Sequence, residues 1–549
     1  MERKELADLI FPNVKDYTYY EEKYVLRNLP EDAVVTRFAP SPTGFVHIGG
    51  IYQSLIARLM TKDQGVFFVR IEDTDQKREV ENGVKQIIDA LYDFDLSPHE
   101  YVDENDVDHG EYGPYKQSLR KDIYQSYAKR LIEEGNGYPC FCSPEDLEDI
   151  RSKQESAKER TGYYGKWTKC RNMPIEMAYE KIKNGDPYII RFKSPGNPDK
   201  KIKHKDIIKG SVDFPENDQD IVIIKSDGLP TYHFAHAVDD HLMQTTHVIR
   251  GDEWLASVPL HLQLFYVLGF KAPKYAHIAP MMKMDGEGKR KLSKRKDPES
   301  AVGYYKEEGI PKQSVLEYLM NIANSNFEIW RKQNPEKSMY DFDFDIKKMS
   351  VSGALFDMVK MLDVSKNVIS RYTAEEVYDA AYIWAKEFDQ ELKEMLDNKE
   401  YSLKVLGIER GNQKPRKDIA KWSDVKYIIS YMYPDKFDKD GEKEYQKITD
   451  EAEINNIVKT YFEKYYDEND DKQMWFDKMK DLAEEYGYAR EVKEYKQNPD
   501  GFKGHVGDIS TVIRVALTTK CNTPDLYEIM QVLGEENVVN RIKKFVEEN

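Results

Sequence analysis

Hydrophobic and polar positions follow one repeating rhythm near the start of the chain. Apolar runs at VVTRFAP (34–40) and VFFVRIE (66–72) predict buried strands, and apolar residues at helical spacing, beginning at Ile51, predict a helix between them. Strands that alternate with helices predict a parallel sheet, which binds its ligands at the carboxyl ends of the strands. We therefore expect chemistry just after Phe38 and just after Glu72.

The rhythm breaks between about 115 and 218, where turns, charged helices and a group of cysteines predict an insertion. It resumes with a strand-like run at DIVIIKSDG (220–228), a helix from about Phe234 and the strand THVIRG (246–251). An amphipathic helix over 254–268 completes this nucleotide-binding half.

Beyond about 350 the spacing of apolar residues becomes helical. The runs VYDAAYIWAKEF (377–388) and MWFDKMKDLAEEYGY (474–488) have this spacing, and Thr373 and Glu376 are spaced as a capping box. A separate α-helical domain is therefore predicted.

The fold class that follows is α/β: a Rossmann-like parallel-sheet domain with an α/β insertion, followed by a C-terminal α-helical domain. The predicted parts are an N-terminal extension (1–33), the first half of the nucleotide-binding fold (34–114), the insertion (115–218), the second half (219–285), a loop and linking region (286–350) and the helical domain (351–549). No role is assigned to the extension.

Composition narrows the class of protein. The chain has 549 residues, 40% of them hydrophobic, which is enough for several cores. No run approaches the ~18 apolar residues of a membrane span, and the start has no signal-peptide pattern, so we expect a cytoplasmic protein without a membrane partner. A net charge of −17 argues against non-specific coating of nucleic acid but allows a local basic surface.

The first motif that carries chemistry is RFAPSPTGFVHIGG (37–50), where a strand gives way to a helix. Prolines and Gly44 fix a tight turn, and Gly49 and Gly50 let a ligand approach the helix amino end, whose free N–H groups favour phosphate. His47 is expected to face that phosphate.

The second motif is KLSKR (291–295) in a lysine-rich loop past the last strand of the nucleotide-binding half. A run of this kind alone is usually a solvated face or a general nucleic-acid patch. Its place after the sheet favours a contact with a triphosphate.

The insertion holds Cys140, Cys142 and Cys170. They supply three thiolates, whereas a structural zinc ion takes four ligands, and the position two after Cys170 is Asn172, a poor zinc ligand. Tyr163, Tyr164 or His204 are alternative fourth ligands. Reduced, metal-free cysteines are the favoured interpretation and a structural zinc the alternative.

Together the two motifs resemble the HIGH and KMSKS signatures of class I aminoacyl-tRNA synthetases, with PSPTG in the form typical of glutamyl-tRNA synthetases. The resemblance runs from about residue 34 to the end and includes EYGPYKQSLR (111–120) and IRVALTTKCNTPDLYEIMQVLG (513–534), which looks like the family's helical anticodon-binding region. Gly50 stands where HIGH has its second histidine, so that histidine's contact with ATP is not carried over.

The resemblance implies roles for particular residues. It implies that the catalytic residues are His47, Lys291, Lys294 and Arg295. It implies that glutamate is bound by Arg37, Ser41, Glu72, Tyr232, His236 and Arg250, with Glu72 taking the ammonium group, although related enzymes often carry another residue at His236. It implies that ATP is bound by Gly44, His47, Gly49, Gly50, Glu253, Trp254, the main chain at Met282, and Lys294.

The implied function is glutamate–tRNA ligation: glutamate is activated with ATP, pyrophosphate is released, and glutamate is transferred to the 3′-terminal adenosine of tRNA(Glu). The implied partners are ATP with Mg²⁺, L-glutamate and tRNA(Glu), with tRNA(Gln) as a second substrate in some members. The resemblance also implies that tRNA is needed for activation and that the protein is a monomer.

Three other interpretations are weighed against this one. Glutaminyl-tRNA synthetases tend to read PEPNG and FDDTN where this chain has PSPTG (40–44) and IEDTD (71–75), and they carry a β-barrel anticodon portion. A shorter paralogue that modifies a tRNA base lacks the C-terminal domain. A catalytically silent tRNA-binding protein is disfavoured by His47, Lys291 and Lys294.

Overall fold

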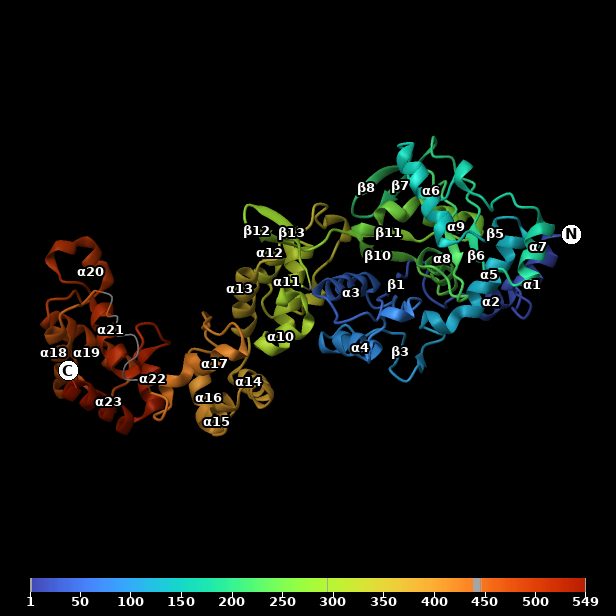
Figure 1. Cartoon of the computed structure of the whole chain (residues 1–549). Helices are drawn as coiled ribbons and strands as arrows, with labels where there is room; N and C mark the ends of the chain where they lie inside the picture. Colours follow the sequence, from blue (N-terminus) through green and yellow to red (C-terminus); the bar gives the residue numbers. More distant parts are fainter. Residues whose placement is uncertain (1, 294, 438–444, 446, 549) are drawn as a thin grey trace. The chain divides into compact units, whose positions relative to one another are not determined.

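The computed structural model describes residues 2–293, 295–437, 445 and 447–548. The chain divides into two compact units (Figure 1). The first unit contains Met1–Tyr304 and Leu316–Asp357, and the second contains Tyr305–Val315 and Met358–Asn549. The helical domain was predicted to start at 351, shortly before Met358, where the long segment of the second unit begins.

Two pairs of parallel strands form the sheet of the first unit. Strands β1 (Val35–Phe38) and β2 (Val66–Val69) pair in parallel and are linked by α3 (Ile48–Thr61). Strands β10 (His247–Gly251) and β11 (Lys274–Ile278) also pair in parallel. The N–H of Thr246 donates to the carbonyl oxygen of Val35 at 3.0 Å, so the two pairs meet along β1 and β10. This is the predicted Rossmann-like sheet.

The predicted helix at 254–268 forms as two elements. A 3₁₀ helix, η4, covers Asp252–Ser257, and the α-helix α9 covers Val258–Val267. Pro259 lies in the first turn of α9, where its missing N–H costs no helical hydrogen bond. The proline therefore marks the start of the α-helix.

The insertion is built on antiparallel strands. Strands β5 (Gly137–Cys140), β6 (Ile189–Phe192) and β9 (Val222–Ile224) form one sheet, and β7 (Lys201–Asp206) and β8 (Gly210–Pro215) form a hairpin. The strand predicted at 220–228 is thus present as β9, but the prediction that it resumes the parallel rhythm was wrong. A short apolar run indicates that a strand is buried, but it does not indicate whether the neighbouring strand is parallel or antiparallel.

The N-terminal extension is folded. Helices α1 (Arg3–Ile10) and α2 (Tyr17–Lys23) lie against α5 (Lys121–Glu133), with Leu6, Ile10 and Tyr20 buried. The remaining helices and strands of the first part of the chain are α4 (Gly83–Asp93), β3 (Tyr101–Val102), β4 (Asp108–His109), α6 (Pro144–Ser156), α7 (Ile175–Lys183), α8 (Tyr232–Leu242), β12 (Met282–Asp285), β13 (Gly288–Lys291), α10 (Val302–Glu308), α11 (Lys312–Ala323) and α12 (Asn326–Gln333).

The described residues of the second unit form helices joined by loops, as predicted (Figure 1). Thr373 and Glu376 make the predicted capping box at the start of α14. The helices from α13 onward are α13 (Met358–Ile369), α14 (Ala374–Phe388), α15 (Gln390–Leu396), α16 (Lys399–Gly407), α17 (Trp422–Ile429), α18 (Glu451–Thr460), α19 (Lys472–Glu485), α20 (Val492–Gln497), α21 (Val506–Thr518), α22 (Leu526–Leu533) and α23 (Glu535–Glu548). In the described part of the chain, no helix is both long and apolar enough to cross a membrane.

Candidate active site

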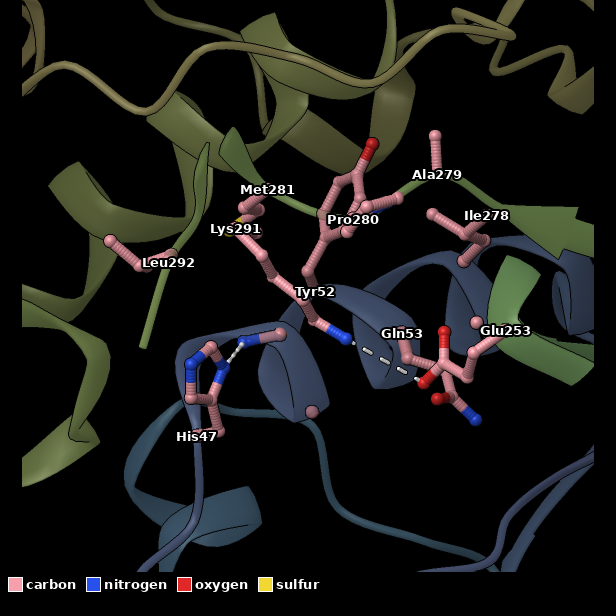
Figure 2. A pocket seen from close by; sticks show the side chains of 13 residues that line it. His47, Tyr52, Gln53, Glu253, Ile278, Ala279, Pro280, Met281, Lys291 and Leu292 are labelled. Carbon is pink, nitrogen blue, oxygen red and sulfur yellow. Dashed lines mark hydrogen bonds and ion pairs between the residues drawn. The ribbon is translucent and has the colours of Figure 1, made fainter. Parts of the chain in front are cut away.

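A cavity of about 360 Å³ lies in the first unit, at the carboxyl ends of the parallel strands. Figure 2 shows its walls, which combine the first motif, the start of η4 and the residues that follow β11. It is lined by His47, Gly49, Gly50, Tyr52, Gln53, Gly251, Glu253, Ile278, Ala279, Pro280, Met281, Lys291 and Leu292. Five predicted ATP-binding or catalytic residues therefore meet at one cavity: His47, Gly49, Gly50, Glu253 and Lys291.

His47 is the N-cap residue of α3. Its Nδ1 accepts the N–H of Gly49 at 2.9 Å, which fixes the ring at the amino end of the helix (Figure 2). A Cβ atom at Gly50 would lie 3.1 Å from the ring of Phe38, closer than most side chains tolerate. The close approach of Phe38 explains why a glycine fits where HIGH has its last histidine.

Lys291 ends β13, in the antiparallel β12–β13 hairpin. Its Nζ lies 3.9 Å from Glu253 Oε1 on the facing wall of the cavity (Figure 2). Arg295 is exposed, and Lys294, the other predicted catalytic lysine, lies outside the described residues.

The loop that carries KLSKR is braced by a buried carboxylate. Asp297, with 1% of its side chain exposed, receives two hydrogen bonds from Arg290, at 2.5 and 2.7 Å, and one from the N–H of Ser293 at 2.9 Å. A little further on, the N–H of Val302 donates to the carbonyl oxygen of Val46 at 3.2 Å. The segment that follows the KLSKR loop is thus hydrogen-bonded to the first motif.

Three predicted ATP-binding residues lie outside the cavity lining: Gly44, Trp254 and Met282. The main-chain N–H of Met282 donates to Ala354 at 3.0 Å and its carbonyl accepts from Phe356 at 2.7 Å, while Met281 lines the cavity in its place. Gly44 has a φ of +135°, which a side chain would strain.

A group of buried charges lies where β1 and β2 end. Asp240 of α8 is shared by Arg37, whose Nε lies 3.3 Å away, and Arg70, whose Nη1 lies 2.6 Å away. Arg70 Nη2 also donates to Glu72 Oε1 at 3.1 Å. Burial raises the pKa of the Glu72 carboxyl, although Arg70 and Arg37 oppose that rise. Predicted residues Arg37 and Glu72 are therefore brought together by two residues that were not predicted, Arg70 and Asp240.

Arg250 differs from these arginines. It is 3% exposed, and within the described part of the chain no carboxylate oxygen lies within 4.0 Å of its guanidinium. Its Nε donates to His277 at 2.9 Å, its Nη1 contacts His261 at 3.1 Å, and its Nη2 donates to the carbonyl oxygen of Trp254 at 3.2 Å. A buried cation surrounded by neutral groups is suited to receive an anion.

Tyr232 lies beside Arg250, with its Oη 3.5 Å from Nη1 and its ring 4.2 Å from that of Trp254. His236 is fully buried, and its ring stacks on that of Tyr232 at 6.0 Å. His236 Nε2 is hydrogen-bonded to the Tyr275 hydroxyl at 2.9 Å, and burial lowers its pKa to about 4. Ser41, by contrast, is exposed at the surface of its turn.

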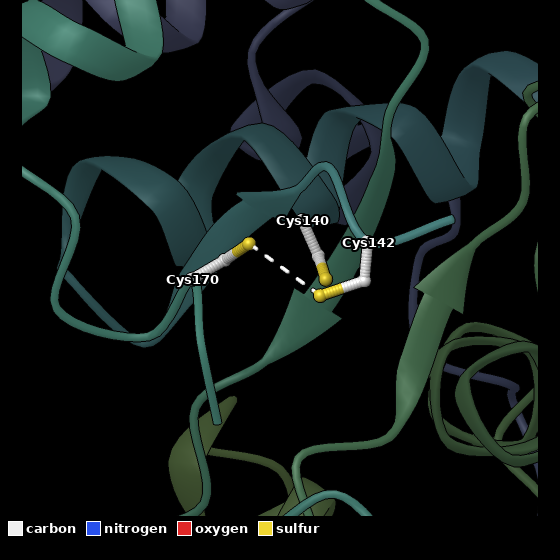
Figure 3. Close-up of side chains that lie close together, drawn as sticks. All are labelled: Cys140, Cys142 and Cys170. Carbon is white, nitrogen blue, oxygen red and sulfur yellow. Dashed lines mark hydrogen bonds between the residues drawn. The ribbon is translucent and has the colours of Figure 1, made fainter. Parts of the chain in front are cut away.

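The three cysteines of the insertion converge (Figure 3). The sulfur atoms of Cys140, Cys142 and Cys170 lie within 4.8 Å of one another, and those of Cys142 and Cys170 are 3.8 Å apart. The hydroxyl oxygen of Tyr163 lies 3.5 Å from Cys140 Sγ and 3.3 Å from Cys142 Sγ. Three sulfur atoms and one hydroxyl oxygen therefore lie close together.

The three sulfur atoms are close enough to share one ion, but a structural zinc ion takes four ligands from cysteine, histidine or carboxylate side chains. Zinc–sulfur bonds of about 2.3 Å in a tetrahedron place the sulfur atoms about 3.8 Å apart. Of the other ligands considered, Tyr164 donates its hydroxyl to the carbonyl oxygen of Arg160 at 2.6 Å, and His204 is a residue of β7. Tyr163 is thus the residue of these three that contacts the cysteine sulfur atoms, although its hydroxyl is not among the usual ligands of structural zinc.

Sequence reasoning missed several buried residues that contact Arg37, Glu72 and Arg250 or their partners. Arg70 left a weak signal, because it is a charge inside the mostly apolar run VFFVRIE (66–72), whereas Asp240 left none, because AHAVDDH (235–241) holds other charged and polar residues as well. Asp206 and His277 left none, because they are far apart in sequence and meet only in the fold, at 2.6 Å.

Two family models match the chain. The model for the catalytic domain of class I tRNA synthetases (E and Q) matches residues 33–362, and the model for an anticodon binding domain matches residues 387–546. The first covers more than half of the chain and includes both motifs and the cavity.

The chain is also similar to curated proteins over its whole length. It is 52% identical to a glutamate–tRNA ligase of Clostridium perfringens (strain SM101 / Type A) and 50% identical to one of Clostridium beijerinckii, each match covering 100% of both chains. A glutamate–tRNA ligase of Acetivibrio thermocellus is 48% identical, again over 100% of both chains.

Solved structures agree with these relatives. A glutamate tRNA ligase from Elizabethkingia meningosepticum, crystallised in complex with its amino acid, is similar with a TM-score of 0.73 at 27% identity, covering 94% of this chain and 99% of that one. A glutamate-tRNA synthetase from Elizabethkingia anophelis gives a TM-score of 0.72 at 27% identity, covering 94% of this chain and 100% of that one. The chain therefore belongs to the glutamate–tRNA ligases, a family of class I tRNA synthetases.

Proposed function

We propose that this chain activates L-glutamate with ATP and transfers it to the 3′-terminal adenosine of tRNA(Glu). The observation that carries this proposal is Arg250: a buried guanidinium with no carboxylate partner among the described residues, directly before Gly251 of the cavity wall. A cation in this setting binds a substrate carboxylate and leaves a neutral amide poorly satisfied.

The chemistry needs placement and charge stabilisation rather than a covalent intermediate. ATP occupies the 360 Å³ cavity, with its phosphates at the amino end of α3, where His47 and the glycines lie. Lys291 and Lys294 stabilise the charge that develops on the departing pyrophosphate. Entry of ATP replaces the Lys291–Glu253 ion pair with a lysine–phosphate contact.

Mg²⁺ would reach the site with ATP, because it prefers oxygen ligands such as those of substrate phosphates and usually keeps several waters. When bound with ATP, the ion would supply charge neutralisation for the leaving group. Lys291 supports it from the β13 side of the cavity.

Glutamate lies between Glu72 and Arg250 in this proposal. Glu72 accepts the ammonium group, and Arg250 pairs with the side-chain carboxylate, with Arg37, Ser41, Tyr232 and His236 completing the pocket. Selection against glutamine follows, because the amide NH₂ would face the guanidinium with donor against donor.

The second unit reads the anticodon in this proposal, which the match to an anticodon binding domain supports. We propose that tRNA is required for activation and that the protein acts as a cytoplasmic monomer. Since some members of the family also charge tRNA(Gln), this is the second tRNA to test.

The test is ATP–pyrophosphate exchange and charging with purified protein. We expect exchange with glutamate only when tRNA is present, and charging with glutamate but not glutamine. Charging of tRNA(Glu) and tRNA(Gln) side by side defines the tRNA range. Absence of exchange in the presence of both tRNAs would instead favour a silent tRNA-binding protein.

We also propose that Cys140, Cys142 and Cys170 hold a structural zinc ion, the alternative to the metal-free cysteines that the sequence favours. The ion would connect the segment after β5 to the distant loop of Cys170. We expect protein purified without added metal to contain zinc in an amount equal to the protein, and Cys170→Ser to lose it together with thermal stability. Cys521→Ser is the matched control. The zinc proposal is contradicted if the purified protein contains no zinc and Cys170→Ser has the melting temperature of the wild type.

A further inference from the structure

Two histidines hold the guanidinium of Arg250, and their chemistry fixes where their protons lie. An arginine side chain donates hydrogen bonds and cannot accept them. His277 Nε2, 2.9 Å from Arg250 Nε, and His261 Nδ1, 3.1 Å from Nη1, must therefore present lone pairs. Both imidazoles are neutral, which agrees with the lowering of their pKa values by burial.

Each histidine uses its remaining N–H to donate a hydrogen bond on the side away from Arg250. The Nδ1–H of His277 donates to Asp206 Oδ2 at 2.6 Å, and the Nε2–H of His261 donates to His233 Nδ1 at 2.9 Å. Asp206, His277 and His261 are all buried. The result is a continuous hydrogen-bonded row from the end of β7 to Arg250.

The carboxylate of Asp206 is itself locked by the main chain. Its Oδ1 accepts the N–H groups of Ile208 at 2.9 Å and Lys209 at 2.8 Å, and its Oδ2 also accepts the N–H of His277 at 3.2 Å. Burial alone would raise the pKa of Asp206, but the hydrogen bonds from His277 and from these main-chain groups hold it below its ordinary value. Asp206 is thus an ionised acceptor of fixed orientation.

This row has a consequence for the N–H groups of Arg250. A guanidinium has five. One goes to His277, one to His261 and one to Trp254, and a fourth reaches the Tyr232 hydroxyl only at 3.5 Å. In the described part of the chain, the fifth, on Nη2, has no acceptor. The N–H of Nη1 that contacts Tyr232 at 3.5 Å and the second N–H of Nη2 are therefore available to donate to a ligand.

We propose that Asp206 and His277 are positioning residues that orient Arg250 toward the carboxylate of glutamate, with Asp206 balancing the arginine's charge across the imidazole ring instead of occupying its binding edge. This inference rests on the proposed function, in which Arg250 binds glutamate. The arrangement differs from that of Arg37 and Arg70, which contact Asp240 directly at 3.3 and 2.6 Å.

The decisive variant is Asp206→Asn. The amide oxygen will keep the N–H groups of Ile208 and Lys209, so the amide NH₂ will face His277 Nδ1. That nitrogen must then accept, which moves the ring proton to Nε2, where it opposes the N–H of Arg250. We expect the KM for glutamate to rise roughly 10- to 100-fold, the scale of a buried charged donor left unsatisfied, while kcat and the KM for ATP change less than about threefold.

Two variants of His277 separate orientation from packing. His277→Phe fills the space but accepts nothing, and should match Asp206→Asn. His277→Gln offers a carbonyl oxygen to Arg250 Nε, and should restore most of the affinity for glutamate. The matched control is Asp220→Asn, another buried aspartate of the insertion, which pairs with Arg171 and Tyr138. It should lower the melting temperature without raising the KM for glutamate.

A double-mutant cycle then tests whether Asp206 acts through Arg250. If it does, Asp206→Asn in an Arg250→Cys background lowers kcat/KM for glutamate by less than about threefold more than Arg250→Cys alone. The inference is overturned if the two substitutions lower kcat/KM for glutamate independently, so that their separate fold-changes multiply in the double variant. It is also overturned if the Asp206→Asn enzyme has a normal KM for glutamate, and in both cases the proposed function stands. Normal glutamate kinetics in Arg250→Cys itself show that the assignment of Arg250 is wrong, and the inference falls with it.

Discussion

Replacing Glu72 by glutamine tests the amino-acid pocket with little risk to the fold. The Glu72 side chain is 9% exposed, and one of its oxygens lies 3.1 Å from Arg70 Nη2. Arg70 keeps Asp240 at 2.6 Å and Asp239 at 3.6 Å when Glu72 loses its charge. The arginine thus remains neutralised, and we expect the melting temperature to change little.

The effect on catalysis should be large, because the ammonium group of glutamate loses its carboxylate in a pocket with little water. Truncating one partner of a buried charge pair costs about 2–5 kcal/mol. At about 1.4 kcal/mol per tenfold, kcat/KM for glutamate should fall roughly 30- to several-thousand-fold. The KM for ATP should stay near its normal value.

The pH dependence supplies an independent check on Glu72. Burial raises its pKa, and only the ionised carboxylate binds an ammonium group. As the pH falls through this raised pKa, the protonated fraction grows and the KM for glutamate should rise. The Glu72→Gln enzyme cannot be protonated there, so its KM should lack this acid limb.

The assay is steady-state charging from about pH 5 to about pH 8, with the KM for glutamate and for ATP measured at each pH. Asp75→Asn is the matched control, because Asp75 belongs to the same loop but is 53% exposed and pairs with Arg78. A Glu72→Gln enzyme with a normal KM for glutamate, or with the acid limb of the wild type, would refute the reasoning.

Two further predictions concern the motifs and the selectivity of the pocket. His47→Ala and Lys294→Ala should each slow activation by roughly 10²–10³-fold without unfolding the protein, because each removes one donor to the transition state. His47→Ala also removes the cap of α3, so a small fall in its melting temperature is expected, whereas near-normal turnover or unfolding would argue against these roles. Arg250→Cys should lower kcat/KM for glutamate by roughly 30- to several-thousand-fold and that for glutamine less, so an unchanged ratio between the two amino acids, measured by charging, would contradict the role of Arg250 in selection.

The sequence predicted those parts of the fold that local pattern determines. Apolar runs located β1 and β2, helical spacing located α3, and the spacing of Thr373 and Glu376 located the cap of α14. Pattern of this kind does not tell which strands pair, so the antiparallel partner of β9 was missed.

The candidate site shows the same division. The motifs supplied His47 and Lys291, which the fold brings to one cavity. The partners of these and other predicted residues come from distant segments: Tyr163 joins the cysteines across a long loop, and Asp206 reaches His277 from another strand. Such contacts depend on tertiary packing, which leaves no periodic signal in either segment.

The sharing of Asp240 between Arg37 and Arg70 also limits how this pocket can change over evolutionary time. Each of the three charges is buried, and Asp240 is the carboxylate that both arginines contact. A substitution that removes one partner of a buried ion pair leaves an uncompensated charge at a cost of about 3–5 kcal/mol, a large part of the stability of an ordinary domain. Variants with altered amino-acid preference are therefore reached by coordinated replacement of acid and base together, or by changes at the uncharged wall around Tyr232, and selection from libraries of single substitutions should return the wild-type residue at Asp240.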